Sequence, residues 1–197
     1  MSVVIIDSGG ANLGSIRYAC ARLGADAVIS RDAATIRAAS HVILPGVGAA
    51  GPAMSRLLAA GLERLIPALT QPVLAICLGM QLLYEASDED GTRCLGILPG
   101  TVRRLPLRDG IRVPHMGWNR LRWVSEDEPL ARAMGGAPWA YFVHGYYAPV
   151  GAETIAGCAH GTAFAALARW RNFLAAQFHP ERSATAGKAL IQAFLAS

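Results

Sequence analysis

The chain lacks long apolar runs, although 53% of its 197 residues are hydrophobic. No stretch approaches the roughly 20 consecutive apolar residues that a membrane-spanning helix needs. The N-terminal run VVII is only four residues long and has no basic residue before it. It therefore differs from a secretory signal peptide, in which positive charge precedes a longer apolar core.

Clustered charge is missing as well. Only 16% of the residues are charged, and all of the 18 basic residues except Lys188 are arginines. The arginines are scattered between Arg17 and Arg182, with no basic run of five or more. Nucleic-acid-binding surfaces usually cluster basic side chains and interleave them with aromatic ones. The net charge of +4 therefore indicates a solvated surface, compatible with an acidic partner surface, rather than a nucleic-acid site.

Paired cysteines of the kind that bind metals are also absent. Cys20, Cys77, Cys94 and Cys158 lie far apart in the sequence. This pattern predicts a reduced, cytoplasmic protein. It gives no sign of a metal or a redox cofactor.

What the chain does have is an alternation of short apolar runs with helical patterns, which implies a parallel sheet covered on both faces. In the second half, strand follows strand, and this favours antiparallel pairing. We expect one domain, residues 1–197, of the α/β class, with a mainly parallel central sheet flanked by helices and additional antiparallel strands. The expected strands are 2–7, 27–29, 41–44, 72–77, 101–104, 111–114, 119–124, 140–144, 154–158, 164–169 and 173–178. The expected helices are 14–23, 33–39, one or two within 49–69, 79–86 and 184–195.

Cys77 lies where the apolar run PVLAIC meets the helical pattern GMQLLYEA. Ala75 and Gly79 place a small residue two positions on either side of the thiol, as in a nucleophile elbow. Small residues let the chain turn sharply there. The thiol would lie at a helix N-terminus, where the helix dipole favours the thiolate. A buried structural cysteine at a strand end is the alternative interpretation.

A cysteine nucleophile needs a base and a group that orients the base. Of the five histidines, His179 ends the run NFLAAQF and is followed by Pro180 and Glu181. Proline favours an extended backbone before it, so His179 and Glu181 would project to similar sides. A carboxylate beside an imidazole fixes its tautomer and stabilises the imidazolium. The sequence therefore predicts a catalytic triad of Cys77, His179 and Glu181.

The segment Pro45-Gly46-Val47-Gly48 is expected to end the strand at 41–44. Glycine permits peptide orientations that aim N–H groups into a cleft. An acyl-transfer site needs such donors for a developing oxyanion. The Leu78 amide is one candidate donor, and an amide from Gly46 or Val47 is the other. An ordinary strand-to-helix turn is the alternative.

These motifs resemble class I glutamine amidotransferases, through CLGMQ around Cys77, PGVG at 45–48 and HPE at 179–181. Longer matches span residues 3–195 and are similar to the glutaminase subunits of imidazole glycerol phosphate synthases: VIIDSGGANLGSI, LPGVGAA, ICLGMQLLYEAS, RVPHMGWN, YFVHGYYA and QFHPERS. The resemblance implies a flavodoxin-like fold and hydrolysis of L-glutamine to glutamate and ammonia through a thioester on Cys77. It also implies a partner, a (β/α)8 cyclase subunit. The cyclase uses the ammonia to make imidazole glycerol phosphate and an aminoimidazole carboxamide nucleotide in histidine biosynthesis.

The resemblance also implies roles for further residues. Gln81 corresponds to a residue that contacts the substrate glutamine, and Glu89 or Asp90 to the partner of its α-ammonium. The segments 114–119 and 141–145 would line the site near the cyclase. The implied partner or gate residues are Trp118, Asn119, Tyr141 and Arg182. Departures from the family pattern occur at Ser8, Gly10, Ala11, Cys94 and Gly145, and none of them is a triad position.

Other functions remain open at this stage. A glutaminase subunit serving a different synthase is one alternative, against which PHMGWN argues. A stand-alone cysteine hydrolase is another, and Gln81 with the PGVG loop argues for glutamine instead. A non-catalytic interaction module would have no need for an intact set of Cys77, His179 and Glu181.

Overall fold

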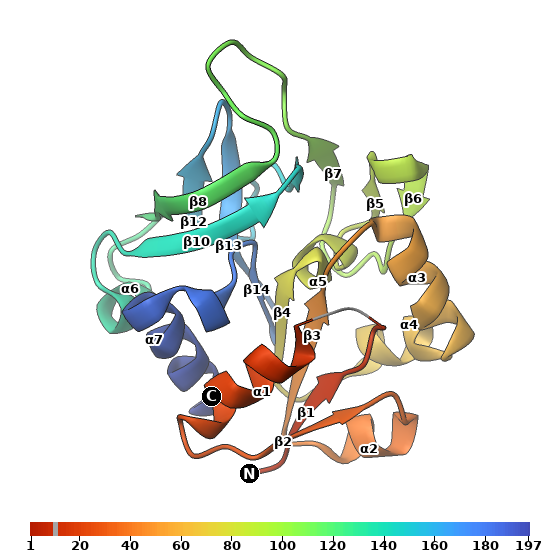
Figure 1. Ribbon diagram of the computed structural model, residues 1–197. Helices are drawn as coiled ribbons and strands as arrows, with labels where there is room; N and C mark the ends of the chain where they lie inside the picture. The colour runs from red at the N-terminus through yellow and green to blue at the C-terminus, as the bar shows by residue number, and fades with distance from the viewer. Residues whose placement is uncertain (10–11) are drawn as a thin grey trace.

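In the computed structural model, which describes residues 1–9 and 12–197, an eight-stranded mixed sheet runs through the centre of the molecule (Figure 1). Its parallel part consists of β2, β1, β3, β4 and β14, in that spatial order. Strands β1, β3 and β4 are buried along their whole length, since helices cover both faces of the sheet. The five strands span Ala27–Ser30, Val3–Ile6, His41–Gly46, Val73–Cys77 and Phe173–Ala176.

The sheet continues beyond β14 with antiparallel strands. β13 (Ala163–Trp170) pairs with β14, and β12 (Thr154–Ala159) and β9 (Arg122–Trp123) follow. The expectation of a mainly parallel sheet with antiparallel strands in the second half is therefore confirmed.

Alternate residues of β1 face two different helical layers. Val4 and Ile6 belong to a core cluster with α2, α3 and α4. Val3 and Ile5 belong to a second cluster, with α1 and α7. The helices span Leu13–Ala21 (α1), Ala33–Ala38 (α2), Ala50–Ala59 (α3), Leu62–Leu65 (α4), Leu78–Leu82 (α5), Pro129–Met134 (α6) and Ala184–Leu195 (α7), with 3-10 turns at Ile66–Ala68 (η1), Glu89–Gly91 (η2) and Pro180–Arg182 (η3). No helix within the described residues is long and apolar enough to cross a bilayer.

Two smaller sheets flank the central one. β8 (His115–Arg120) and β10 (Trp139–His144) form an antiparallel pair. A third core cluster lies beneath this pair and is closed by α6 and α7. The second small sheet combines β11 (Tyr146–Tyr147), β7 (Thr101–Arg104), β5 (Ala86–Ser87) and β6 (Thr92–Arg93).

Several predicted boundaries were wrong. The helix expected over 79–86 ends at Leu82, because the carbonyls of residues 82–84 accept hydrogen bonds from the N–H groups of residues 95–98 instead. Residues 111–114 form an isolated bridge followed by a bend rather than a strand. The strand expected over 119–124 is the end of β8 plus β9, and β8 already begins at His115. Helix α6 and the short strands β5, β6 and β11 were not predicted.

Pro45 and Gly46 were expected to end β3, but both belong to the strand. The register of β3 with β1 stops at Ile43, whereas its register with β4 continues to Gly46. Pro45 therefore has a neighbouring strand on one side only, and this is where a sheet tolerates a residue without an N–H. Of the departures in the first loop, Ser8 is buried. Gly10 and Ala11 lie outside the described residues.

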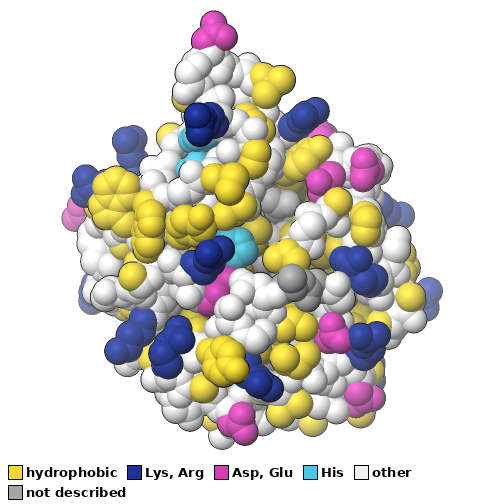
Figure 2. All heavy atoms as spheres, in the orientation of Figure 1, with side chains coloured by type: hydrophobic (Ala, Val, Ile, Leu, Met, Phe, Trp, Pro, Cys, Tyr) yellow, Lys and Arg dark blue, Asp and Glu magenta, His cyan; other side chains and the backbone are white. Residues whose placement is uncertain are grey.

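Apolar side chains are exposed on one face of the β8–β10 pair. Met116 and Trp118 of β8 are 64% and 49% exposed, and Trp139 of β10 is 54% exposed. By register, Met116 lies opposite Val143 and Trp118 opposite Tyr141. We call these five side chains the β8–β10 face. Figure 2 shows hydrophobic side chains gathered over this part of the molecule.

Candidate active site

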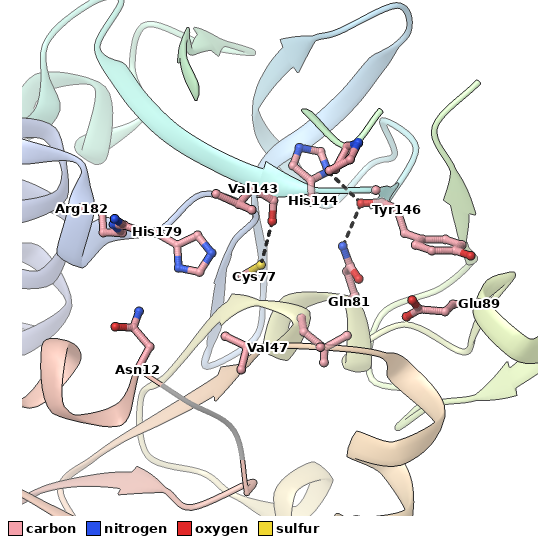
Figure 3. Close-up of a pocket in the computed structure, with 14 residues that line it drawn as sticks. Asn12, Val47, Cys77, Gln81, Glu89, Val143, His144, Tyr146, His179 and Arg182 are labelled. Carbon is pink, nitrogen blue, oxygen red and sulfur yellow. Dashed lines mark hydrogen bonds between the residues drawn. The ribbon is translucent and has the colours of Figure 1, made fainter. Parts of the chain in front are cut away.

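A pocket of about 630 Å³ lies beyond the carboxyl ends of β3 and β4, the edge of a parallel sheet where ligands usually bind. Figure 3 shows its walls, which are built from segments far apart in the sequence. The predicted residues Val47, Cys77, Leu78, Gln81, Glu89, His179 and Arg182 all line it. Its other lining residues are Asn12, Gly48, Pro114, Val143, His144, Gly145 and Tyr146.

Cys77 is held in a strained backbone conformation where β4 passes into α5. Its φ of 54° and ψ of −112° are unusual for a residue with a side chain. Strain of this kind costs about 1–3 kcal/mol and collects at functional sites. The thiol thus sits at the start of a helix, as a nucleophile elbow requires.

Two glycines make this elbow possible. A Cβ on Gly79 would lie 2.0 Å from the Leu44 carbonyl oxygen, and a Cβ on Gly46 would lie 2.6 Å from the Gly79 nitrogen. Both values are far below ordinary van der Waals contact. The end of β3 can therefore approach the turn after Cys77 only because both positions lack side chains. Gly46 lies behind the pocket wall, whereas Val47 and Leu78 form part of it.

The His179 imidazole is oriented by Glu181. Its Nδ1 lies 2.8 Å from Glu181 Oε1, and the side chain of Glu181 is fully buried. The same oxygen accepts a hydrogen bond from the Asn12 side-chain amide. With Nδ1 bonded to the carboxylate, Nε2 is left for the thiol or a reacting group.

The charge state of His179 follows from these neighbours. Burial opposes its protonation, but the adjacent Cys77 sulfur and then Glu181 outweigh burial and raise the pKa of His179 to about 10. At neutral pH the ring is therefore an imidazolium. In a thiolate–imidazolium pair, the ring already carries the proton that a leaving amine takes.

Helix α7 fixes the His-Pro-Glu turn from behind. A Cβ on Gly187 would lie 1.8 Å from the Pro180 carbonyl oxygen. The absence of a side chain at this position lets α7 pack directly against η3. The position of Glu181 is thereby tied to the core beneath α7.

The Gln81 side chain is fixed by two hydrogen bonds from its amide nitrogen. Gln81 Nε2 donates to the Tyr146 carbonyl at 2.8 Å and to Gln177 Oε1 at 2.9 Å. Both N–H groups are thus used within the protein. Its oxygen is the remaining polar group, which suits an acceptor for ligand N–H groups.

Glu89 is held at the N-terminus of α3. Its Oε2 accepts a hydrogen bond from the Ala50 N–H at 2.7 Å, which leaves Oε1 as the second acceptor. Glu89, rather than Asp90, is among the residues that line the pocket. The geometry therefore favours Glu89 as the carboxylate available to a bound cationic group.

A buried pair of neutral histidines supports the wall next to Gln81. His144 Nδ1 lies 2.8 Å from the Tyr146 carbonyl and so carries the proton, and its Nε2 accepts from His115 Nδ1 at 3.0 Å. Burial lowers the pKa of His144 to about 3 and that of His115 to about 4. The neighbouring His160, which stacks on His115, lowers both further.

This pair predicts loss of stability in mild acid. Between pH 6.5 and about 4, the unfolded chain binds protons that the folded imidazoles cannot, so the free energy of unfolding falls as the pH falls. For His144 the loss is about 1.4 kcal/mol per pH unit below 6.5. Urea unfolding at several pH values measures it, and His144→Gln should have a shallower dependence. An equal slope in this variant would rule out His144 as a source.

Of the four predicted partner residues, only Arg182 lines the pocket. The Arg182 guanidinium lies 5.2 Å from the centre of the Tyr141 ring. The Tyr141 ring in turn packs edge-on against Trp118 at 5.8 Å. Asn119 donates to the Ala159 carbonyl at 3.0 Å. The β8–β10 face is therefore continuous with the pocket mouth through Tyr141 and Arg182.

The four cysteines should differ sharply in reactivity. Burial raises the pKa of Cys20, Cys94 and Cys158 to about 11, so at pH 8 each is ionised in about one molecule in a thousand. Cys94 is 8% exposed and Cys77 7%, which makes Cys94 a matched control. We expect a γ-electrophilic glutamine analogue to label Cys77 alone, as read by peptide mapping. Equal labelling of Cys94 would contradict an activated Cys77.

Two pocket contributors were missed by sequence reasoning, whereas His144 falls within the predicted segment 141–145. Asn12 and Gln177 carry ordinary polar side chains in segments that also fit structural roles. Asn12 contacts Glu181, 169 positions away, and Gln177 contacts Gln81, 96 positions away. The one local signal is that Gln177 lies two residues before His179 on the same strand-end segment.

Comparisons with known proteins agree with this geometry. The glutamine amidotransferase class-I family model matches residues 4–197. An imidazole glycerol phosphate synthase subunit HisH from Xanthomonas euvesicatoria is 55% identical over 193 residues, covering 98% of this chain and 96% of the relative. The subunit HisH from Xylella fastidiosa (strain Temecula1) is 50% identical, with the same coverage.

Solved structures share the fold at lower identity. A crystal structure of a glutamine amidotransferase has a TM-score of 0.74 at 21% identity, covering 98% of this chain and 97% of the other. The glutaminase domain of a Trypanosoma brucei CTPS, with bound acivicin, has a TM-score of 0.66 at 15% identity and covers 100% and 92%.

Proposed function

The chain belongs to the class I glutamine amidotransferase family, and we propose that it is the glutaminase subunit of an imidazole glycerol phosphate synthase. The observation that carries the proposal is the convergence of Cys77, His179 and Glu181 at one pocket that also contains Gln81 and Glu89. Residues 1–197 act as one amidotransferase domain. The four cysteines, all in the described part of the chain, are free thiols, which suits a reducing cytoplasm.

The thiol attacks the side-chain amide carbon of L-glutamine. His179 already holds the proton of the Cys77–His179 pair, so the sulfur forms the bond to carbon without a further proton transfer, and the amide oxygen takes the negative charge. As the tetrahedral intermediate collapses, the C–N bond breaks and His179 returns the proton to the departing ammonia. Water then attacks the γ-glutamyl thioester while His179 accepts its proton, and glutamate leaves as the thiol is restored.

The oxyanion of each tetrahedral intermediate needs two N–H donors. The Leu78 amide follows the nucleophile directly at the start of α5. The Val47 amide is the second donor, in the wall formed by the end of β3, with Gly46 holding that strand end against the elbow. Preorganised donors of this kind stabilise the transition state without reorganisation during the reaction.

Substrate glutamine is oriented by the groups left free in the pocket. The Gln81 side-chain oxygen accepts from the substrate, since its own amide nitrogen is already bonded. The free oxygen of Glu89 pairs with the α-ammonium group. Their two separate positions fix which end of the ligand reaches Cys77.

The partner is a cyclase subunit with a (β/α)8 barrel, as the resemblance to imidazole glycerol phosphate synthases implies. It docks on the β8–β10 face with Trp118, Asn119, Tyr141 and Arg182 at the contact. Ammonia then passes to the cyclase and attacks its phosphoribulosyl-formimino nucleotide. The products are imidazole glycerol phosphate and an aminoimidazole carboxamide nucleotide.

The test is a glutamate-release assay on the chain mixed with the cyclase and its nucleotide. We expect glutamine hydrolysis that is matched by cyclase product, with asparagine as an inert control. Glutamine hydrolysis without coupling to the cyclase would point to a different synthase. Hydrolysis of unrelated amides or esters in place of glutamine would point to a stand-alone hydrolase.

A further inference from the structure

Tyr141 and His179 are joined by a closed set of three hydrogen bonds centred on Ser183. The His179 N–H donates to the Tyr141 carbonyl at 3.0 Å. The Tyr141 N–H donates to Ser183 Oγ at 2.9 Å, and the Ser183 hydroxyl donates to the His179 carbonyl at 2.7 Å. The backbone of the triad histidine is therefore fixed to strand β10 at both its N–H and its carbonyl.

Ser183 makes these bonds instead of those that its position favours. It is the N-cap of α7, where a serine oxygen commonly accepts from an N–H of the first turn. Within the described part of the chain, its side chain makes no such capping hydrogen bond. It is 1% exposed, so the hydroxyl is enclosed by protein. The hydroxyl thus serves the contact between η3 and β10 rather than the helix end.

Strand β10 reaches the nucleophile as well. Val143, two residues after Tyr141, presents its carbonyl to the Cys77 thiol, with Sγ at 3.8 Å (Figure 3). In the described residues β10 pairs with β8 alone and stands apart from the eight-stranded sheet. A single strand therefore contacts both halves of the Cys77–His179 pair.

We propose that Ser183 is a positioning residue of the glutaminase reaction, whose hydroxyl locks His179 to Tyr141 and so holds the imidazole where it can exchange a proton with Cys77. This inference rests on the proposed function. Because Tyr141 also belongs to the β8–β10 face, the same lock passes a displacement of that face to His179.

The first test is Ser183→Ala in the complex with the cyclase. We expect kcat for glutamine to fall about 10- to 100-fold, because small displacements of a reacting group cost rates of this order. KM should stay within about twofold, since Gln81 and Glu89 are untouched. Ser183→Thr, which keeps the hydroxyl, should restore most of kcat. Thr154→Val is the matched control, since it removes a buried hydroxyl that accepts the Gly151 N–H at 2.9 Å.

The same substitution made in a variant that lacks the His179 imidazole shows whether Ser183 acts through His179. In His179→Asn, adding Ser183→Ala should change the residual rate by less than about twofold, because groups that act as a unit are not additive. A full additional loss there would overturn the proposal, as would a Ser183→Ala kcat equal to that of Thr154→Val. If Ser183→Ala does not fold, Ser183→Cys replaces it, and a wild-type kcat in that variant overturns the proposal. A wild-type complex that leaves glutamine intact refutes the proposed function instead.

Discussion

Replacing Cys77 with serine is expected to lower glutamine-dependent synthesis by the complex at least about 10³-fold and to leave ammonia-dependent synthesis unchanged. Loss of a triad nucleophile costs up to about 10⁶-fold in well-studied hydrolases. The variant loses the sulfur that contributes most to raising the pKa of His179, and a serine hydroxyl is a weaker nucleophile than a thiol at its free pKa. Ammonia supplied from solution needs no thioester, so the cyclase reaction should continue.

The control for this substitution is Cys158→Ser. Cys158 is 4% exposed, lies in the core cluster beneath the β8–β10 pair and is not among the residues that line the pocket. Both reactions should survive in that variant. Substantial release of glutamate by purified Cys77→Ser protein would refute the assignment of the nucleophile. A parallel loss of ammonia-dependent synthesis would instead indicate that the substitution disturbs assembly.

The parallel half of the fold could be predicted because its signals are local. The strands that became β1, β3 and β4 read as short apolar runs, and burial on both faces of a sheet leaves little room for polar residues. Helix α7 was predicted with its observed bounds, Ala184–Leu195, because its apolar face repeats over three turns. In each case the local pattern and the tertiary environment favour the same structure.

The elements that were predicted poorly are those whose structure is decided by tertiary contacts. The helix after Cys77 ends at Leu82, because N–H groups of residues 95–98 donate hydrogen bonds to the carbonyls of residues 82–84. These donors come from a later part of the chain, so the local sequence pattern does not indicate them. Strands β5, β6 and β11 have two residues each, too few for any periodicity to appear. β8 alternates in burial, but its sequence HMGWNR places a glycine and an arginine within the strand, which obscures the pattern.

The candidate site divides in the same way. Cys77 with its flanking glycine, and His179 with Glu181, lie in short motifs whose spacing carries the chemistry. The contacts that complete the pocket join residues distant in sequence, such as Asn12 with Glu181 and Gln81 with Tyr146. No periodicity records such a pairing. The Ser183 lock was equally hidden, because a serine before a helix reads as an ordinary N-cap.

The second large effect expected is activation of the glutaminase by its partner, by about 10²- to 10³-fold in kcat. This is the rate factor associated with one oxyanion donor. Val47 lies in the pocket wall, and Gly48 after it has a φ of 89°, where only glycine is unstrained. The peptide that carries the Val47 N–H joins Val47 to Gly46, and glycine at position 46 lets this peptide present either its N–H or its carbonyl. The isolated chain would then favour the orientation that withholds the donor.

Docking supplies a physical route to the active orientation. The partner contacts expected at Trp118, Tyr141 and Arg182 lie at the pocket mouth, and Tyr141 is bonded to His179 through Ser183. A partner can shift this equilibrium only by binding one orientation more tightly than the other. For a 100-fold shift in population, the difference in binding free energy is about 2.7 kcal/mol. Burial of the exposed apolar side chains of the β8–β10 face can supply a binding free energy of that size.

The measurement compares glutamate release by the chain alone, with the cyclase, and with the cyclase plus its nucleotide. We expect the rate to rise in that order, with Trp118→Ala reducing the activation but leaving the basal rate of the lone chain intact. Val124→Ala is the matched control, since Val124 is also exposed, at 67%, but lies outside the β8–β10 face. A lone chain that already hydrolyses glutamine at the full rate would refute the coupling and leave the triad standing. Full activation of the Trp118→Ala variant would show that the partner docks on another surface. The free energy that biases the oxyanion donor must come from docking contacts, and this variant removes contacts of the β8–β10 face.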